Sequence, residues 1–151
     1  MMIGAILTGI TYTSYQIISK SYRSFNTRQA ELAQVERLDE LLKKDFNRAE
    51  VIEKDDRGIL VKSKRDTIRY EFTPDYILRV SSITDTFKLR NEDITASFED
   101  QPVDGKGAGG EDNRLDRLTF SLLFQNESAG YQYHKVYSSA NLFDRNPYAL
   151  R

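Results

Sequence analysis

The longest uninterrupted feature of the sequence is an N-terminal run without helix-breaking residues. The first proline of the chain is Pro74, and the only glycines before residue 54 are Gly4 and Gly9. Proline ends or kinks a helix and glycine weakens one, so their scarcity predicts one continuous helix over residues 3–54. At ~1.5 Å per residue, about 50 residues form a rod of roughly 75 Å, much longer than a domain of this size is wide. We therefore expect the helix to project from the rest of the chain.

The first part of this predicted helix carries no charge. The first 18 residues contain no charged side chain, although 30% of the whole chain is charged. An apolar helix surface in water is unfavourable, so we expect a membrane or another protein to cover it. The expected membrane or assembly surface consists of Ile3, Ile6, Leu7, Ile10, Tyr12, Tyr15, Ile17, Ile18 and Tyr22. The tyrosines stand where apolar sequence gives way to charged sequence, which fits either a membrane-interface belt or contacts between subunits.

The charge-free segment is neither an ordinary signal peptide nor a full membrane span. A signal peptide needs a basic region and a small-residue cleavage site, and residues 1–18 have neither. A span needs about 20 mainly apolar residues, but the clearly apolar part ends near Ile10 and hydroxyl side chains follow. We expect it to be the later half of an apolar segment that begins upstream. Residues 1–27 are then the membrane and assembly half, and residues 28–151 the globular domain.

The second part of the predicted helix is amphipathic. Its apolar residues recur at helical spacing, which predicts a helix face that packs on a sheet. This predicted helix–sheet core consists of Val35, Leu38, Leu42, Phe46, Ala49 and Ile52. The opposite face carries acid–base pairs four residues apart, Asp39 with Lys43 among them, which we interpret as a solvated face.

After residue 54 the apolar period changes from that of a helix to that of a strand. In residues 67–73, for example, Ile68, Tyr70 and Phe72 alternate with charged residues. The predicted strands are residues 58–63, 67–73, 76–80, 87–89, 94–98, 118–124 and 131–137, with turns at 74–75, 91–93 and 126–130. Short one-sided strands predict an antiparallel meander with one solvated face. The fold class is therefore α+β: a long projecting helix whose C-terminal half packs on an antiparallel β-sheet.

This order of elements resembles the type IV pilin-like family, and the J-type minor pseudopilins of type II secretion most of all. The likeness lies in GITYTSYQIISKSY (9–22) and LDELLKKDFNRAEVI (38–52), followed by GILVKS, TIRYEFTPDYILRV, DTFKL and ITASFE. It covers roughly residues 5–137. The resemblance implies a single-pass protein of the bacterial inner membrane with its globular domain outside the cytoplasm. It also implies other pilin or pseudopilin subunits as partners. The family's basic leader, peptidase-site glycine and following glutamate do not occur here, so no family site residue is carried over.

Little in the sequence indicates chemistry. The chain has no cysteine and a single histidine, His134, which we interpret as a sheet-face residue. A Gly-rich loop within residues 100–113 carries Asp104, Glu111, Asp112 and Asn113, whose oxygens could bind calcium, but their spacing matches no EF-hand. We favour a solvated loop, no cofactor and no enzymatic activity.

Two functional hypotheses follow. The first is a structural subunit of a type II secretion or type IV pilus-type filament, assembled through its N-terminal helix. The second is a membrane-tethered extracytoplasmic module that binds a ligand or substrate and does not polymerise. A net charge of −1 argues against nucleic acid as a partner, and under the first hypothesis we expect no small-molecule substrate.

Overall fold

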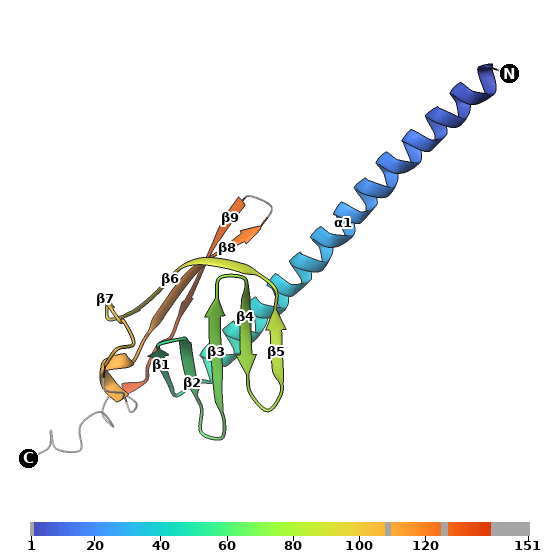
Figure 1. Ribbon diagram of the computed structural model, residues 1–151. Helices are drawn as coiled ribbons and strands as arrows, with labels where there is room; N and C mark the ends of the chain where they lie inside the picture. Colours follow the sequence, from blue (N-terminus) through green and yellow to red (C-terminus); the bar gives the residue numbers. More distant parts are fainter. Residues whose placement is uncertain (1, 108–109, 125–126, 140–151) are drawn as a thin grey trace, which may run out of the picture. The chain divides into compact units, whose positions relative to one another are not determined.

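The computed structural model describes residues 2–107, 110–124 and 127–139, without the side chains of residues 2, 110 and 111. These residues form one α-helix, nine β-strands and one short 3-10 helix, η1 (Gly110–Asn113) (Figure 1). The chain divides into two structural units, residues 1–34 and 35–151, and each is described by itself.

The predicted helix is present but ends earlier than expected. Helix α1 spans Met2–Arg48, a length of 47 residues. The Ala49 amide still donates to the Asp45 carbonyl, whereas the Glu50 amide donates to the carbonyl of Lys62 in a strand. Backbone pairing with that strand therefore ends the helix, where no glycine or proline does. The extension of the helix to residue 54 was wrong, and Ile52 lies in a strand instead of on the helix stripe.

The first sheet is a five-stranded antiparallel meander. Its strands, in spatial and sequence order, are β1 (Val51–Asp55), β2 (Gly58–Lys62), β3 (Thr67–Thr73), β4 (Tyr76–Val80) and β5 (Thr84–Phe87). The sequence prediction missed β1 and placed β5 too late, at residues 87–89. The alternation in β3 is real: Tyr70 is fully buried, and it lies opposite Ile59 in β2.

The later strands form a second antiparallel sheet instead of extending the first. Its order is β7 (Gln101–Pro102), β6 (Arg90–Phe98), β8 (Arg117–Phe124) and β9 (Glu127–His134). The predicted turn at 91–93 was wrong, because these residues belong to β6. The register of β6 shifts between Glu92 and Thr95, and Asp93 adopts a φ of 54°. The predicted turn at 126–130 mostly belongs to β9; residue 126 lies outside the described residues.

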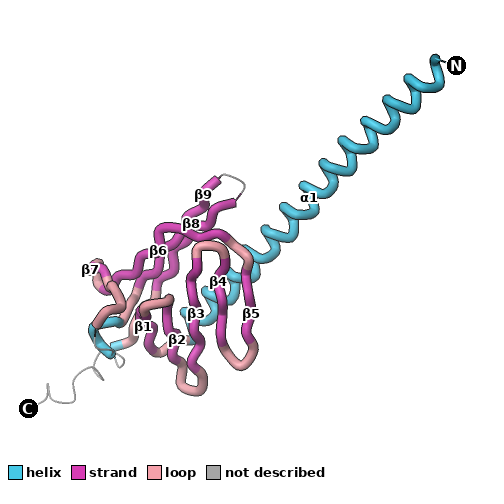
Figure 2. The backbone as a smooth tube through the Cα atoms, in the orientation of Figure 1, coloured by secondary structure: helices cyan, strands magenta, loops and turns pink. Residues whose placement is uncertain are grey.

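One apolar core joins the end of α1 to both sheets. The ring centroids of Phe46 on α1 and Tyr133 on β9 are 5.6 Å apart, and those of Phe72 on β3 and Phe120 on β8 are 5.4 Å apart. The helix–sheet core predicted from the sequence lies in this cluster; Val35 is partly buried, and the fully buried members are Leu38, Leu42, Phe46, Ala49 and Ile52. The fold is therefore α+β, with a long N-terminal helix packing on antiparallel sheets (Figure 2), a pilin-like arrangement in general terms.

Candidate functional site: an apolar helix surface and a polar groove

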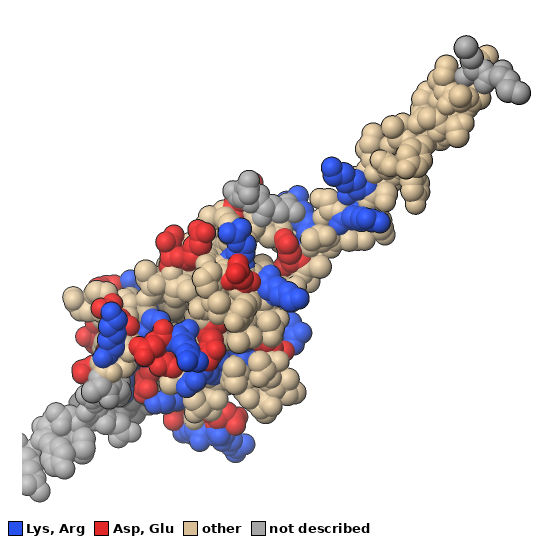
Figure 3. All heavy atoms as spheres, in the orientation of Figure 1, with Lys and Arg blue, Asp and Glu red and all other residues tan. Residues whose placement is uncertain are grey.

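The first candidate site is the apolar surface of α1 in the N-terminal unit. Its large side chains are 58–76% exposed. They are the residues predicted from the sequence: Ile3, Ile6, Leu7, Ile10, Tyr12, Tyr15, Ile17, Ile18 and Tyr22. We call this set the apolar helix surface. Figure 3 shows the start of the helix without red or blue atoms, whereas charged side chains are spread over much of the rest.

The hydroxyl groups among these apolar residues bond to the helix itself. The hydroxyl of Thr11 donates to the Leu7 carbonyl at 2.9 Å, and that of Ser14 to the Ile10 carbonyl at 2.8 Å. Thr8 and Thr13 bond to the preceding turn in the same way. Hydroxyls with internal partners do not require water, so these polar side chains do not prevent burial of the segment in apolar surroundings.

Small residues leave space beside the helix backbone. A Cβ added at Gly4 or Gly9 would meet no atom within 4 Å, and Ala5 stands four positions before Gly9. Small residues four apart allow a second helix to approach closely. Within the described residues, no helix combines the length and hydrophobicity that crossing a membrane requires.

A buried polar network holds the helix on the first sheet in the second unit. Asp45 on α1 is 4% exposed. It accepts a hydrogen bond from the Tyr70 hydroxyl at 2.5 Å and forms an ion pair with Arg79 Nε at 2.9 Å. Burial raises the pKa of Tyr70, and the hydrogen bond to the Asp45 carboxylate raises it further. Burial alone would lower the pKa of Arg79, but its bonds to Asp45 and Tyr70 outweigh burial and raise it.

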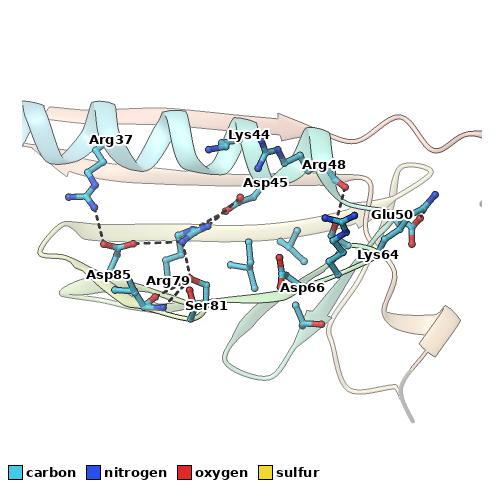
Figure 4. A pocket seen from close by; sticks show the side chains of 17 residues that line it. Arg37, Lys44, Asp45, Arg48, Glu50, Lys64, Asp66, Arg79, Ser81 and Asp85 are labelled. Atoms are coloured by element: carbon cyan, nitrogen blue, oxygen red, sulfur yellow. Dashed lines mark hydrogen bonds and ion pairs between the residues drawn. The ribbon is translucent and has the colours of Figure 1, made fainter.

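Further charges extend this network toward solvent. Arg79 Nη1 lies 3.7 Å from Asp85 on β5, and Asp85 pairs with Arg37 on α1 at 2.9 Å. Figure 4 shows this chain of charges between the helix and strands β4 and β5. On the second sheet, the Tyr133 hydroxyl donates to Asp39 at 2.8 Å. Burial raises the pKa of Tyr133, and the Asp39 carboxylate adds to that effect.

The second candidate site is a groove of about 900 Å³ beside this network. Residues 37–48 of α1 form one wall, and the β2–β3 and β4–β5 turns form the others (Figure 4). We call it the polar groove. Its lining carries six basic side chains (Arg37, Lys44, Arg48, Lys64, Arg65, Arg79) and four acidic ones (Asp45, Glu50, Asp66, Asp85), a net charge of +2.

Three of the four residues considered for calcium, Asp104, Asp112 and Asn113, have side chains that the structure describes. The Asn113 side chain is buried and closes the loop on itself: its Nδ2 donates to the Gly107 carbonyl and its Oδ1 accepts from the Gly107 amide, both at 3.2 Å. Asp104 and Asp112 are exposed, and the Glu111 side chain lies outside the described residues. In the described part of the chain, no three His, Cys, Asp or Glu side chains gather as a metal site would require. His134 is exposed on β9.

The buried network and the polar groove were not predicted from the sequence. One signal was available: Asp45 lies directly before Phe46 and three residues after Leu42, inside the apolar stripe of the helix. A buried acid needs a partner. Arg79 was a candidate, because it is the basic residue of the predicted strand over residues 76–80. The groove has no local signal, because three separate segments form it.

Comparisons of this chain with protein-family models, with curated proteins and with solved structures find no match. The apolar helix surface and the polar groove are therefore the two features on which a function can be argued.

Proposed function

We propose that this chain is a non-enzymatic structural subunit of a pilin-like filament, a pilin or minor pseudopilin that assembles through its N-terminal helix. The observation that carries the proposal is the apolar helix surface, on a helix whose later residues pack on antiparallel sheets. The resemblance of residues 9–22 and 38–52 to pseudopilins, J-type most of all, supports the same conclusion. The machine would be of the type II secretion or type IV pilus type.

The energetics favour burial of the apolar helix surface. A fully buried aliphatic or aromatic side chain contributes about 1.5–3 kcal/mol. Association costs an estimated ~4–15 kcal/mol in lost translational and rotational freedom and further ordering. Nine large side chains that are each 58–76% exposed can offset such a cost when helices of neighbouring subunits cover them.

In this proposal, residues 1–27 lie in the bacterial inner membrane before assembly and the globular domain lies outside the cytoplasm. The described helix does not meet the length and hydrophobicity of a span. On assembly, apolar helices of other pilin or pseudopilin subunits cover the apolar helix surface in this proposal. The internally bonded threonines fit either environment.

Sedimentation of the full chain tests the proposal. We expect the protein, purified in mild detergent, to associate into oligomers when the detergent is diluted, because water then meets the apolar helix surface. The double variant Ile6→Asp, Ile10→Asp should stay smaller, because a buried unpaired carboxylate is costly. Val136→Asp is the matched control, since Val136 is 78% exposed in the other unit. A wild-type chain that sediments as a monomer without detergent would contradict the proposal.

The polar groove favours a second candidate, a membrane-tethered extracytoplasmic module that binds a ligand without polymerising. Under that alternative, the apolar helix surface serves only as an anchor. Detergent dilution does not separate the two, because an apolar anchor would also associate in water. The oligomeric state in lipid vesicles does, because a tethered module would remain monomeric there.

A further inference from the structure

We propose that the polar groove binds an acidic, extended peptide segment of a partner protein. This inference goes beyond the proposed function, which concerns the N-terminal helix. It rests on the unequal pairing of charges in the groove and on the spacing of its cations.

The groove contains more cations than its own acids neutralise. Three of the four carboxylates are engaged: Asp45 with Arg79 at 2.9 Å, Asp85 with Arg37 at 2.9 Å, and Glu50 with Lys64 at 3.6 Å. Asp66 is the fourth.

Three cations remain for that one carboxylate. Among the described residues, no ion pair forms with Lys44, Arg48 or Arg65. Arg48 lies in the last turn of α1, where the helix dipole favours a positive charge, but the dipole explains neither Lys44, a turn earlier, nor Arg65 on the β2–β3 turn. An anionic ligand would neutralise this excess.

The spacing of the cations suits an extended chain. Lys44 and Arg48 are four residues apart on one helix face, so they stand about 6 Å apart along the axis. Alternate residues of an extended peptide point to the same side and are about 6.6 Å apart. Two carboxylates at alternate positions can therefore each meet one of these cations. Arg65, on the opposite wall, can meet a third anionic group.

The groove also has apolar lining residues, which suit the apolar side chains on the opposite side of such a peptide. Ile68 is partly buried and Ile83 is 72% exposed, and both line the groove. Apolar side chains on the alternate face of an extended peptide can cover the exposed side chain of Ile83. A volume of about 900 Å³ is also far larger than one inorganic anion, so a peptide uses more of the site.

The probe for the test is a fluorescein-labelled hexapeptide of alternating glutamate and leucine with blocked ends. Its binding to the full chain is measured in detergent micelles by fluorescence anisotropy. We expect saturable binding that weakens as salt rises from about 50 to 300 mM, because salt screens exposed charges. A peptide with glutamine in place of glutamate should bind at least about 10-fold more weakly.

The groove variant carries Lys44→Gln, Arg48→Gln and Arg65→Gln. We expect it to bind the acidic peptide about 10-fold or more weakly, from the loss of three charge-assisted contacts. All three side chains are exposed, so the variant should fold, and thermal unfolding verifies this.

The control variant removes the same number of exposed cations elsewhere, with Arg57→Gln, Arg90→Gln and Lys106→Gln. It should bind like the wild type.

Three results would overturn the inference. The first is equal binding of the glutamate and glutamine peptides. The second is an equal loss of binding in the groove variant and the control variant. The third is that the peptide does not bind, while the chain self-associates and the groove variant abolishes that self-association. The last would identify a second copy of the chain as the occupant. The first two results leave assembly through the apolar helix surface untested either way, because the groove variant leaves that surface intact, so the failure of this inference and that of the proposed function can be distinguished.

Discussion

At the scale of single residues, Asp45 fixes how α1 meets the first sheet. Its carboxylate is 4% exposed and bonds to both Tyr70 and Arg79, which lie on β3 and β4. Removing one partner of a buried ion pair leaves an uncompensated charge, which costs more than the pair contributes. The position of the helix on the sheet therefore depends on one acid within an otherwise apolar stripe.

We predict that Asp45→Ala lowers the free energy of unfolding by about 3 kcal/mol, because the largely buried Arg79 side chain then keeps only the more distant carboxylate of Asp85, at 3.7 Å. Tyr70→Phe should cost only about 1 kcal/mol, because the variant loses one neutral hydrogen-bond donor while the ion pair of Asp45 with Arg79 remains. Asp66→Ala is the control, because Asp66 is an exposed acid of the same groove, and its effect should stay within about 0.5 kcal/mol. Urea denaturation measures all three, and similar losses for Asp45→Ala and Asp66→Ala would refute the role of Asp45.

The buried tyrosines predict a loss of stability at alkaline pH. The pKa values of Tyr70 and Tyr133 are raised in the fold, chiefly by burial. Their unfolded-state pKa is about 10, so above that pH the unfolded chain releases protons that the folded chain retains. Stability is therefore fully present below pH ~10 and falls above it, by up to ~1.4 kcal/mol per pH unit for each tyrosine.

Urea denaturation between pH 8.5 and 11 checks this prediction. The double variant Tyr70→Phe, Tyr133→Phe should show a shallower loss, which isolates the tyrosines from other groups. Lys54 acts in the opposite direction, since burial lowers its pKa and the folded chain gives up that proton first. The same pH slope in both proteins would show that the tyrosines are not its cause.

At the scale of elements, the boundary between α1 and β1 shows what local sequence can and cannot determine. The helical spacing from Val35 to Ala49 predicted the buried face correctly. The spacing continues to Ile52, yet Val51 and Ile52 pair with Lys62 and Val61 of β2. Both continuations bury Ile52, so hydrophobic periodicity alone could not choose between them. The pairing with β2 selects the strand over the helix at Val51 and Ile52, and this pairing is a tertiary contact that the local sequence does not contain.

The close approach of β2 to β3 depends on Gly58, a residue without a side chain, at the start of β2. A Cβ at Gly58 would lie 1.8 Å from the Tyr70 carbonyl oxygen. We predict that Gly58→Ala destabilises the fold by more than about 2 kcal/mol, because the backbones of β2 and β3 would have to separate. Gly130→Ala on β9 is the matched control, since an added Cβ there meets nothing within 4 Å. Equal melting temperatures for the two variants would contradict this close approach.

Several other features could not be predicted because they depend on contacts distant in sequence. The alternation in β3, β4 and β8 identified those strands, but it does not say which strands share a sheet. The separation into two sheets follows from the pairing of β6 with β8 across the Gly-rich loop. The apolar helix surface was predictable residue by residue, because its signal is local. The polar groove was not, because α1, the β2–β3 turn and the β4–β5 turn each contribute only part of it.

At the scale of the whole molecule, the two units present surfaces of opposite character. The N-terminal unit exposes large apolar side chains on a charge-free helix segment. The second unit buries most of its large apolar residues and exposes mixed charge, including the polar groove. Because each surface belongs to one unit, variants can alter assembly and ligand binding separately.

Cross-linking between copies tests the proposed assembly most directly. The chain has no cysteine, so a single Tyr15→Cys substitution places one thiol on the apolar helix surface. Ser82→Cys places one on an exposed turn of the other unit. A disulfide forms when two Cα atoms come within about 4.4–6.8 Å. Under mild oxidation in lipid vesicles, we predict covalent dimers of the Tyr15→Cys protein and monomers of the Ser82→Cys protein. Monomers of both, or equal dimer yields from both, would contradict assembly through the N-terminal helix.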